Sequence, residues 1–409
     1  MTTSVPSPAS STPPSTPLPP DSPTSDFASG PDPDSSRGRQ AEAGDLPTPP
    51  TAGFGVYIHI PFCSRRCDYC AFATWDDRGE LISSYMAALK SQTRSHVAGW
   101  EEDRVTSVFV GGGTPSLVPA RDLAEVISLL PLAPGAEVSV ECNPDDVTVE
   151  SMRILAGAGV ERISLGVQSM VDHVLVGLGR SHTPENVASA VAAVRAAGIE
   201  RLNLDLIYGG AGETPADWNE TLVRALALEP SHVSAYALTV EAGTPLASDP
   251  ARHPDDDDQA DKYVMADEML TGAGLANYEV SNWARPGEQC RHNLLYWVQG
   301  EYLGLGCAAH SHIDGRRFWS VRTPERFIAA VTEGGELEAG SETLDEEARE
   351  LERLQLALRL ATGVPAETVP VEVRHLVDVE GGRAVLTREG RLMANEVAVR
   401  LVPRSGGTS

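Results

Sequence analysis

The strongest constraint in this sequence is a loop of three cysteines, Cys63, Cys67 and Cys70, which follows an apolar run at 56–60 that ends at Pro61. Thiolate ligands select zinc, copper(I) or an iron–sulfur cluster. A structural zinc site takes four protein ligands, usually as two short pairs, and the sequence has no second pair. Three cysteines can hold three irons of a 4Fe-4S cluster and leave the fourth iron open. The spacing therefore favours a cluster, with a chance grouping or a zinc loop completed by a distant histidine as the alternatives.

Downstream of this loop, short β-branched runs alternate with longer helical patterns. Strands are predicted at 56–60, 107–112, 137–142, 162–168, 201–208 and 233–240, and helices near 79–96, 119–130, 149–157, 184–197, 215–228 and 258–272. Thr183-Pro184 and Thr214-Pro215 each place a capping residue before a proline at the first helical position. Such alternation implies a parallel sheet with right-handed crossovers. Six units predict an α/β fold, an open, partial (β/α)6 barrel, with its chemistry at the carboxyl ends of the strands.

Polar residues stand at or near the ends of several predicted strands. The second strand runs into three glycines, 111–113, which let backbone approach a ligand closely. Glu141 and Gln168 end the third and fourth strands, Asp205 lies on the fifth, and Arg180 follows the fourth. An arginine can clamp a carboxylate with two parallel hydrogen bonds, and Glu141 can accept from ribose hydroxyls. Solvated loop side chains are the alternative at each position taken singly.

Five motifs together give the chain a family resemblance. They are Tyr-Ile-His-Ile-Pro-Phe-Cys-x3-Cys-x2-Cys at 57–70, Gly-Gly-Gly-Thr-Pro at 111–115, Glu-Cys-Asn-Pro at 141–144, Gly-Val-Gln-Ser at 166–169 and Leu-Gly-Arg-x-His at 178–182. Across about 55–400 the sequence resembles the oxygen-independent coproporphyrinogen III oxidase family of radical S-adenosylmethionine (SAM) proteins. The resemblance implies that SAM chelates the open iron. It also implies a set of SAM contacts: Tyr57, Tyr69, Gly112, Gly113, Thr114, Glu141, Gln168, Arg180 and Asp205.

Position 72 distinguishes two branches of that family. The oxidases continue the motif as CxxxCxxCxC, whereas this chain has Phe72 in place of the last cysteine. Residues 1–50 do not have a foldable composition, so an equivalent of the oxidases' folded N-terminal extension is not expected. Both departures are similar to the HemW-type heme chaperones, which the resemblance describes as binding heme and passing it to heme-dependent respiratory proteins.

A second motif, HNxxYW at 292–297, resembles one associated with heme binding in those chaperones. A histidine beside an aromatic pair can ligate iron and pack against a porphyrin, so the resemblance implies a heme site that involves His292. The residues alone favour a hydrogen-bonded structural histidine in an aromatic cluster, and the resemblance shifts the balance to a ligand. Cys290 and His310 are the other candidate ligands.

The prediction is therefore a heme chaperone with three cofactors or cargoes, namely a 4Fe-4S cluster, SAM and heme, and no catalytic residue of its own. Its predicted partners are heme, heme-accepting respiratory proteins and, if SAM is cleaved, an electron donor. Two other functions remain open. One is oxygen-independent coproporphyrinogen III oxidation by a deoxyadenosyl radical, and the other is a zinc-bearing scaffold.

Charge and composition restrict the possible partners and the cellular location of the protein. The formal net charge is −26, with 58 acids and 32 bases, which argues against nucleic acid or an anionic membrane as main partner. The absence of an 18-residue apolar stretch and of a signal peptide predicts a cytoplasmic protein, with peripheral membrane contact left open. Cys142, Cys290 and Cys307 are expected to be small buried residues.

Four segments are expected along the chain. Residues 1–50 carry 13 of the 30 prolines and predict a disordered tail. The radical SAM barrel is predicted at 51–285, a linker with the HNxxYW region at 286–340, and a small winged-helix-like α+β domain at 341–409. Residues 343–401 have eight arginines and no lysine against eleven acids, so this domain is expected to be a lid or a partner-docking surface rather than a DNA reader.

Overall fold

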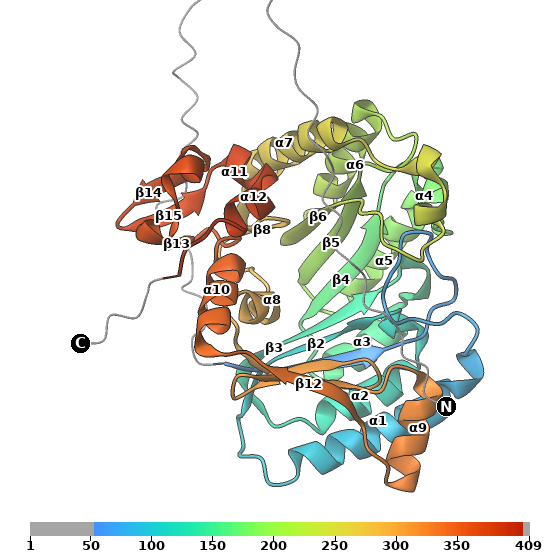
Figure 1. Ribbon diagram of the computed structural model, residues 1–409. Coiled ribbons are helices and arrows are strands. Elements are labelled where there is room, and N and C mark those ends of the chain that lie inside the picture. The colour runs from blue at the N-terminus through green and yellow to red at the C-terminus, as the bar shows by residue number, and fades with distance from the viewer. Residues whose placement is uncertain (1–52, 404–409) are drawn as a thin grey trace, which may run out of the picture. The chain divides into compact units, whose positions relative to one another are not determined.

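The computed structural model describes residues 53–403, and the predicted tail at 1–50 lies outside them. Six strands form a continuous parallel array in chain order, as expected (Figure 1). They are β1 (Phe54–Ile60), β2 (Val105–Gly112), β3 (Leu132–Cys142), β4 (Arg162–Gln168), β5 (Arg201–Tyr208) and β6 (His232–Ala237). The sheet is open at both edges, so the barrel is partial.

The predicted helices form between these strands. They are α1 (Ile82–Val97), α2 (Ala120–Ser128), α3 (Val149–Gly157), α5 (Pro184–Ala196), α6 (Pro215–Ala227) and α7 (Asp256–Gly272), and a short α4 (Asp172–Gly177) follows β4. Thr183 and Thr214 each accept a hydrogen bond from the third helical N–H and form a capping box, with proline in the first turn. These local interactions explain why the helix starts were readable from sequence.

The two faces of the parallel array differ in chemistry. Side chains alternate between faces along a strand, and one face carries buried valine, leucine and isoleucine that join the main hydrophobic core. The other, inner face carries buried polar residues such as Ser139, Ser164 and Asn203. Parallel sheets covered by helices usually read apolar on both faces, so a polar inner face indicates an interior that serves a site.

The stretch at 286–340 is not a linker. It contains α8 (Arg291–Trp297), β9 (Glu301–Leu305), β10 (His310–Ile313), β11 (Arg316–Ser320) and α9 (Pro324–Glu333), followed by β12 (Glu338–Thr343). Strand β9 pairs in parallel with β1, and β10, β11 and β12 continue the sheet in antiparallel fashion. At the opposite edge, β7 (Ala276–Glu279) and β8 (Asn282–Ala284) follow β6, which makes a sheet of twelve strands. These strands are short. The pairings β10–β11 and β7–β8 are hairpins of neighbouring segments, whereas β9 with β1 and β8 with β6 join segments that are distant in sequence.

The C-terminal residues have a hydrophobic core of their own. Helix α10 (Glu346–Ala357) packs with a three-stranded sheet of β13 (Val364–Pro365), β15 (Arg383–Leu386) and β14 (Val377–Glu380), and with α11 (Arg388–Leu392) and α12 (Ala394–Ala398). This is the small α+β unit that the sequence predicted. No helix within the described range is both long and apolar enough to cross a membrane.

Candidate functional site

The cysteine loop leaves the carboxyl end of β1 and is closed at its base. Phe62 forms a β-bridge with Trp75, and the Cys63 N–H donates to the Trp75 carbonyl over 3.0 Å. Farther out, Asp68 anchors the loop to the segment after β6. Its carbonyl accepts from the Leu246 N–H, and its carboxylate pairs with Arg252 at 2.8 Å. The loop is thus held above the strand ends from two sides.

The donors around the loop suit thiolate ligands. Arg180 donates from Nη1 to the Cys67 sulfur over 3.3 Å. Burial is the largest effect on the Cys63 thiol and leaves its pKa raised, although the neighbouring Thr114 and Thr74 hydroxyls act in the opposite direction. Cationic and hydroxyl donors stabilise a thiolate, so the residues present fit a cluster. Between residues 53 and 403, no three histidine, cysteine or carboxylate side chains converge on a single metal ion. Because cluster ligands each bind a different iron, they need no such convergence.

The glycine turn after β2 lies against the start of the cysteine loop. The Gly113 and Thr114 N–H groups donate to the Ile60 and Phe62 carbonyls over 2.7 and 2.8 Å. Gly112 has a φ of +114°, and a Cβ at this residue would collide with the His59 ring. Glycine is therefore required here by close packing and backbone conformation. Because these N–H groups already donate to carbonyls of the protein, a ligand at this turn would contact backbone carbonyls or the exposed side of the Gly112 backbone.

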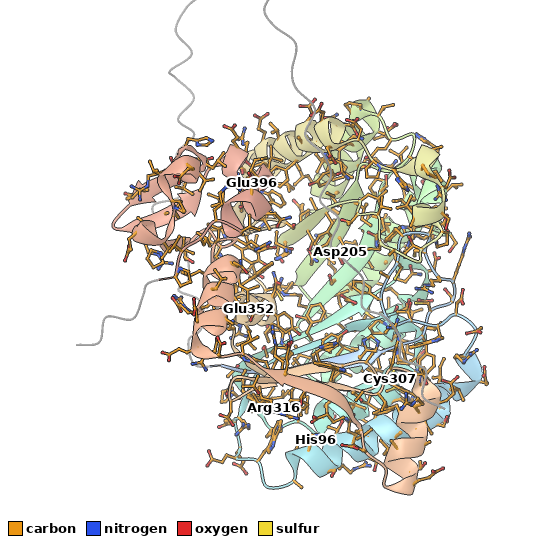
Figure 2. All side chains as sticks on the ribbon, viewed as in Figure 1. His96, Asp205, Cys307, Arg316, Glu352 and Glu396 are labelled. Atoms are coloured by element: carbon orange, nitrogen blue, oxygen red, sulfur yellow. The ribbon has the colours of Figure 1, made fainter. Side chains whose placement is uncertain are left out.

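Two carboxylates face the interior, and no cationic side chain between residues 53 and 403 forms an ion pair with either of them. Glu141 on β3 accepts from the Gly112 N–H over 3.2 Å, and burial together with the charge of Asp205 raises the pKa of Glu141 to about 8. Asp205, on β5 (Figure 2), is half-buried like Glu141, and desolvation raises its pKa despite hydrogen bonds from Ser164 and Asn203. Both groups can accept hydrogen bonds, and a cationic ligand would stabilise their charged forms.

Gln168 and Arg180 meet at the end of β4. Gln168 has a φ of +63°, at a point where the pairing with β5 shifts register between Gly166 and Gln168. Non-glycine residues in this conformation and bulges that re-aim a side chain both concentrate at functional sites. Arg180 donates from Nη2 to the Asn143 side chain and the Gly166 carbonyl, so it joins β3, β4 and the cysteine loop.

The two predicted SAM tyrosines have different surroundings. Tyr57 on β1 shares a 3.0 Å hydrogen bond with His59, and burial raises its pKa. Tyr69 packs beside the small apolar group that includes Leu178 and Leu246, and burial raises its pKa as well. The strand ends thus gather Tyr57, Glu141, Gln168, Arg180 and Asp205 around one interior.

A buried hydrogen-bond chain that sequence reasoning missed leads inward from Asp205. The Asn203 amide donates to the Asp205 carboxylate over 2.8 Å, and His232 Nδ1 contacts the Asn203 oxygen at 2.7 Å. His232 Nε2 lies 2.8 Å from the Tyr278 hydroxyl, which also accepts from Asn293 over 3.3 Å. With Asn203 so oriented, His232 carries its proton on Nδ1, and every donor points toward Asp205. The chain joins the strand ends to the HNxxYW motif.

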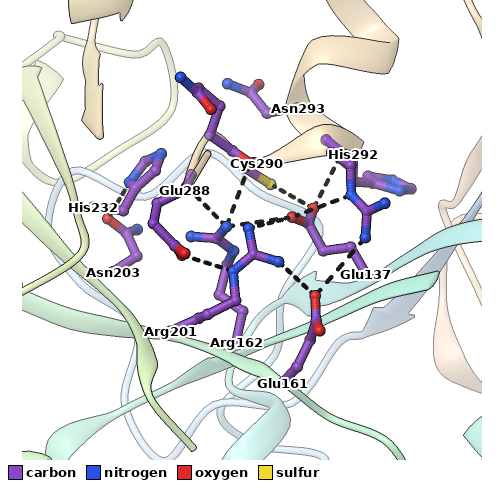
Figure 3. Close-up of polar contacts among 12 residues, drawn as sticks. Glu137, Glu161, Arg162, Arg201, Asn203, His232, Glu288, Cys290, His292 and Asn293 are labelled. Carbon is purple, nitrogen blue, oxygen red and sulfur yellow. Dashed lines mark hydrogen bonds and ion pairs between the residues drawn. The ribbon is translucent and has the colours of Figure 1, made fainter. Parts of the chain in front are cut away.

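A second network lies at the opposite, amino ends of the strands (Figure 3). Glu137 on β3 is fully buried and pairs at 3.3 Å with both Arg162 on β4 and Arg201 on β5. It also accepts from the Cys290 thiol and the His292 N–H. Although burial raises the pKa of Glu137, the arginines lower it more, and the net pKa is below its usual value. Glu137 thereby anchors the start of α8 to the sheet.

His292, the predicted heme ligand, is buried within that anchor. Its Nδ1 lies 2.9 Å from the Ser107 hydroxyl and its Nε2 lies 2.9 Å from the Tyr296 hydroxyl, and its ring stacks on Phe109. Burial lowers its pKa to about 4. Neither nitrogen is free for iron unless Ser107 or Tyr296 moves away. The geometry corresponds to the structural histidine that the residues alone also allowed, and the ligand role of His292 stays a prediction.

The other candidate ligands have different surroundings. Cys290 is buried against Glu137, and Cys142 and Cys307 are buried too, as expected. His310 lies at the start of β10 and is exposed. The HNxxYW motif therefore lies inside the molecule, whereas His310 faces solvent.

Comparisons with known proteins agree with this architecture. Residues 57–225 match the radical SAM superfamily. The chain is 40% identical over 374 residues to the heme chaperone HemW of Mycobacterium tuberculosis, covering 86% of this chain and 96% of that protein. It is 30% identical to HemW of Bacillus subtilis, covering 84% and 97% of the two chains.

A solved structure supports the fold. The radical SAM coproporphyrinogen III oxidase HemN from Escherichia coli superimposes with a TM-score of 0.74 at 21% identity, over 85% of this chain and 90% of that one. The radical SAM family implies a 4Fe-4S cluster and SAM. The extent of identity to the chaperones is decisive for the branch, and the chain belongs to the HemW family of heme chaperones, within the radical SAM superfamily.

Proposed function

We propose that this protein binds heme and delivers it to heme-dependent respiratory proteins, with a 4Fe-4S cluster on Cys63, Cys67 and Cys70 and SAM at the strand ends. The observation that carries the proposal is the 40% identity to a heme chaperone along nearly the whole of that relative. The thiolate-stabilising donors Arg180, Thr114 and Thr74 around the loop support the cluster.

The SAM assignment rests on the interior carboxylates. SAM carries a sulfonium, an ammonium and ribose hydroxyls, all of which favour ionised Glu141 and Asp205. Arg180 lies beside the same interior and suits the SAM carboxylate. When bound, the cluster supplies an electron that can cleave SAM. The protein's own groups hold, orient and desolvate the ligand.

Phe72 supports the chaperone over the oxidase. It occupies the place of the oxidases' additional cysteine and is 69% exposed, so no thiol stands there. An apolar side chain this exposed beside a cofactor loop suits contact with a partner or with the cargo.

The function is tested by anaerobic reconstitution followed by two parallel assays. The protein should bind hemin stoichiometrically and form no protoporphyrinogen IX from coproporphyrinogen III. Cys67→Ala should lose the iron–sulfur absorption near ~400 nm, because two cysteines cannot retain the cluster. Coproporphyrinogen turnover over many cycles would overturn the chaperone, and stoichiometric zinc without iron would overturn the cluster.

A further inference from the structure

The turn that closes the cysteine loop contains a buried threonine, Thr74. It is 5% exposed, and its Oγ1 makes no hydrogen bond with any residue between 53 and 403. By contrast, the buried Thr93 hydroxyl on α1 donates to the Leu89 carbonyl over 2.7 Å. The hydroxyls of Ser139 and Ser320 are also buried without a partner in that range, but they lie within β3 and β11 rather than at the cysteine loop. A buried polar group left unpaired in a native fold indicates a missing water, ion or ligand.

Backbone pairing places the Thr74 hydroxyl on the cysteine side of the turn. Phe62 and Trp75 form a parallel β-bridge, and both side chains pack on the main hydrophobic core. The Trp75 N–H donates to the Pro61 carbonyl over 2.8 Å, and the Cys63 N–H donates to the Trp75 carbonyl over 3.0 Å. Successive side chains of extended segments point to opposite sides. Thr74 and Cys63, each next to a bridged residue, therefore share the side that faces away from the core.

The backbone before Thr74 is also held in place. His59 Nε2 lies 3.0 Å from the Ala73 carbonyl, which can only accept, so Nε2 carries the ring proton. His59 Nδ1 then accepts from the Tyr57 hydroxyl over 3.0 Å. The Thr74 N–H donates to the Phe72 carbonyl over 2.8 Å. Because the chain is fixed on both sides of Thr74, its hydroxyl keeps one position beside the loop.

The Cys63 sulfur is the acceptor that this arrangement offers. The Thr74 hydroxyl already acts on the Cys63 thiol, where it opposes the larger effect of burial on the pKa. A cysteine that binds iron is a thiolate, and hydrogen bonds to a charged acceptor are stronger than those to a neutral one. Hydrogen bonds to the sulfurs of an iron–sulfur cluster are among the features that set its reduction potential. A donor to a ligand sulfur stabilises the reduced, more negative state and so raises that potential.

We propose that the Thr74 hydroxyl donates a hydrogen bond to the Cys63 sulfur when that sulfur is a cluster ligand, and that this bond raises the reduction potential of the cluster. The inference rests on the proposed function, because it assumes that the cysteine loop holds a 4Fe-4S cluster. Thr74 is a positioning residue that acts through Cys63 and is not itself a ligand. The hydroxyl that lacks a partner among the described residues gains one when the cluster is bound.

The test compares Thr74→Val, which keeps the shape of the side chain without the hydroxyl, with Thr74→Ser, which keeps the hydroxyl. The proteins are reconstituted anaerobically, and the midpoint potential of the cluster is measured by a redox titration followed by electron paramagnetic resonance. Thr74→Val should hold as much iron as the wild-type protein and have a lower midpoint potential, and Thr74→Ser should recover most of the shift. Thr93→Val removes a buried hydroxyl that is paired within α1, and it should leave the potential unchanged.

The stability of the cluster-free protein separates this role from a purely structural one. The Thr74 hydroxyl makes no hydrogen bond among the described residues, so cluster-free Thr74→Val should unfold at the same urea concentration as the wild-type protein or at a higher one. Thr93→Val loses a hydrogen bond that is present and should unfold at a lower concentration. A clear loss of stability in cluster-free Thr74→Val would show that the side chain is structural and would overturn the assignment.

The remaining outcomes distinguish this inference from the proposed function. A wild-type potential in Thr74→Val would overturn the inference, as would a potential in Thr74→Ser that is shifted as far as in Thr74→Val. Loss of the cluster in Thr74→Val but not in Thr74→Ser would support a need for the hydroxyl, whereas its loss in both variants would contradict it. Failure of the wild-type protein to assemble a 4Fe-4S cluster would instead overturn the proposed function.

Discussion

Glu137 and Glu141 lie four residues apart on the same strand, and their surroundings are opposite. Glu137 lies near the amino ends of the strands, which we call the floor of the barrel. There it pairs with Arg162 and Arg201, and its pKa is lowered. Glu141 lies near the carboxyl ends of the strands, which we call the mouth. It faces Asp205, and its pKa is raised to about 8. At the floor, the Glu137 carboxylate is therefore neutralised by arginines of the protein. At the mouth, the carboxylates of Glu141 and Asp205 have no cationic partner among the described residues. The difference indicates that the floor serves stability and the mouth serves binding.

The largest expected effect comes from the floor. Glu137→Ala leaves two arginines without their shared carboxylate and should destabilise the protein by about 3–5 kcal/mol, the usual cost of breaking a buried ion pair. Urea unfolding of the purified variant measures this. Glu141→Ala is the matched control on the same strand and should cost far less. Equal losses for both would remove the distinction between floor and mouth.

For the affinity of SAM, we expect variants at the mouth to have a larger effect than variants at the floor. Glu141→Ala and Arg180→Ala each remove a charge-assisted hydrogen bond to SAM worth on the order of 1.5–3 kcal/mol, so each should weaken SAM binding by roughly 10- to 100-fold. Calorimetry on anaerobically reconstituted protein measures the dissociation constants. The conservative floor variant Arg201→Lys, which keeps the charge, should bind SAM like the parent protein. Unchanged SAM affinity in both mouth variants would show that SAM binds elsewhere.

Stability should depend on pH with opposite signs at the two sites. The folded-state pKa of Glu141 is raised to about 8 from an ordinary 4.5, so its neutral form favours folding at low pH, and this contribution is lost as pH rises through 8. Glu141→Gln stays neutral, and relative to it the wild-type protein should lose about 2–3 kcal/mol between pH 6 and 9, at about 1.4 kcal/mol for each pH unit below the folded-state pKa. The pKa of Glu137 is lowered, so its contribution is present at neutral pH and lost on acidification. Urea unfolding at several pH values checks both trends, and parallel curves for the wild-type protein and Glu141→Gln would refute the first.

The smallest effect is expected from the hydrogen-bond chain that links the two regions. Asn203→Ala removes a donor that orients the Asp205 carboxylate and should weaken SAM binding by a few-fold, consistent with about 0.5–1.5 kcal/mol for one neutral hydrogen bond. Asn203→Ser keeps a polar group and should recover part of the affinity. SAM affinity in Asn203→Ala equal to that of the parent would mean that Asp205 is oriented without Asn203.

The sequence predicted what depends on local signals. Thr183-Pro184 and Thr214-Pro215 marked helix starts because capping is a contact within one turn. Strands β4 and β5 matched their predicted bounds because β-branched and apolar runs define buried parallel strands. Gly112, Glu141 and Gln168 were predicted at strand ends because the carboxyl ends of parallel strands are known places for chemistry, and they lie at or beside the ends of β2, β3 and β4.

What the sequence could not show depends on pairing between distant segments. Strand β9 pairs with β1 although nearly the whole barrel lies between them in the chain, so the sequence did not predict that the sheet continues beyond β1. Glu137 was placed on a strand, but its ion pairs with Arg162 and Arg201 arise only from strand register. The available signal was an acid at the start of a predicted strand whose other inward residues lie nearer the strand end. The burial of His292 likewise depends on Ser107 and Tyr296, and no local pattern contains it.

The most direct test of whether Glu141 at the mouth binds SAM is calorimetry of SAM binding at pH 7 in buffers of different ionisation enthalpy. Glu141 is largely protonated in the free protein, and the positive charges and hydroxyl donors of SAM should lower its pKa. Binding should therefore release a fraction of a proton approaching ~1, and Glu141→Gln should release clearly less. A binding enthalpy that is independent of buffer, or equal proton release by the wild-type protein and Glu141→Gln, would contradict the claim that Glu141 loses its proton when SAM binds.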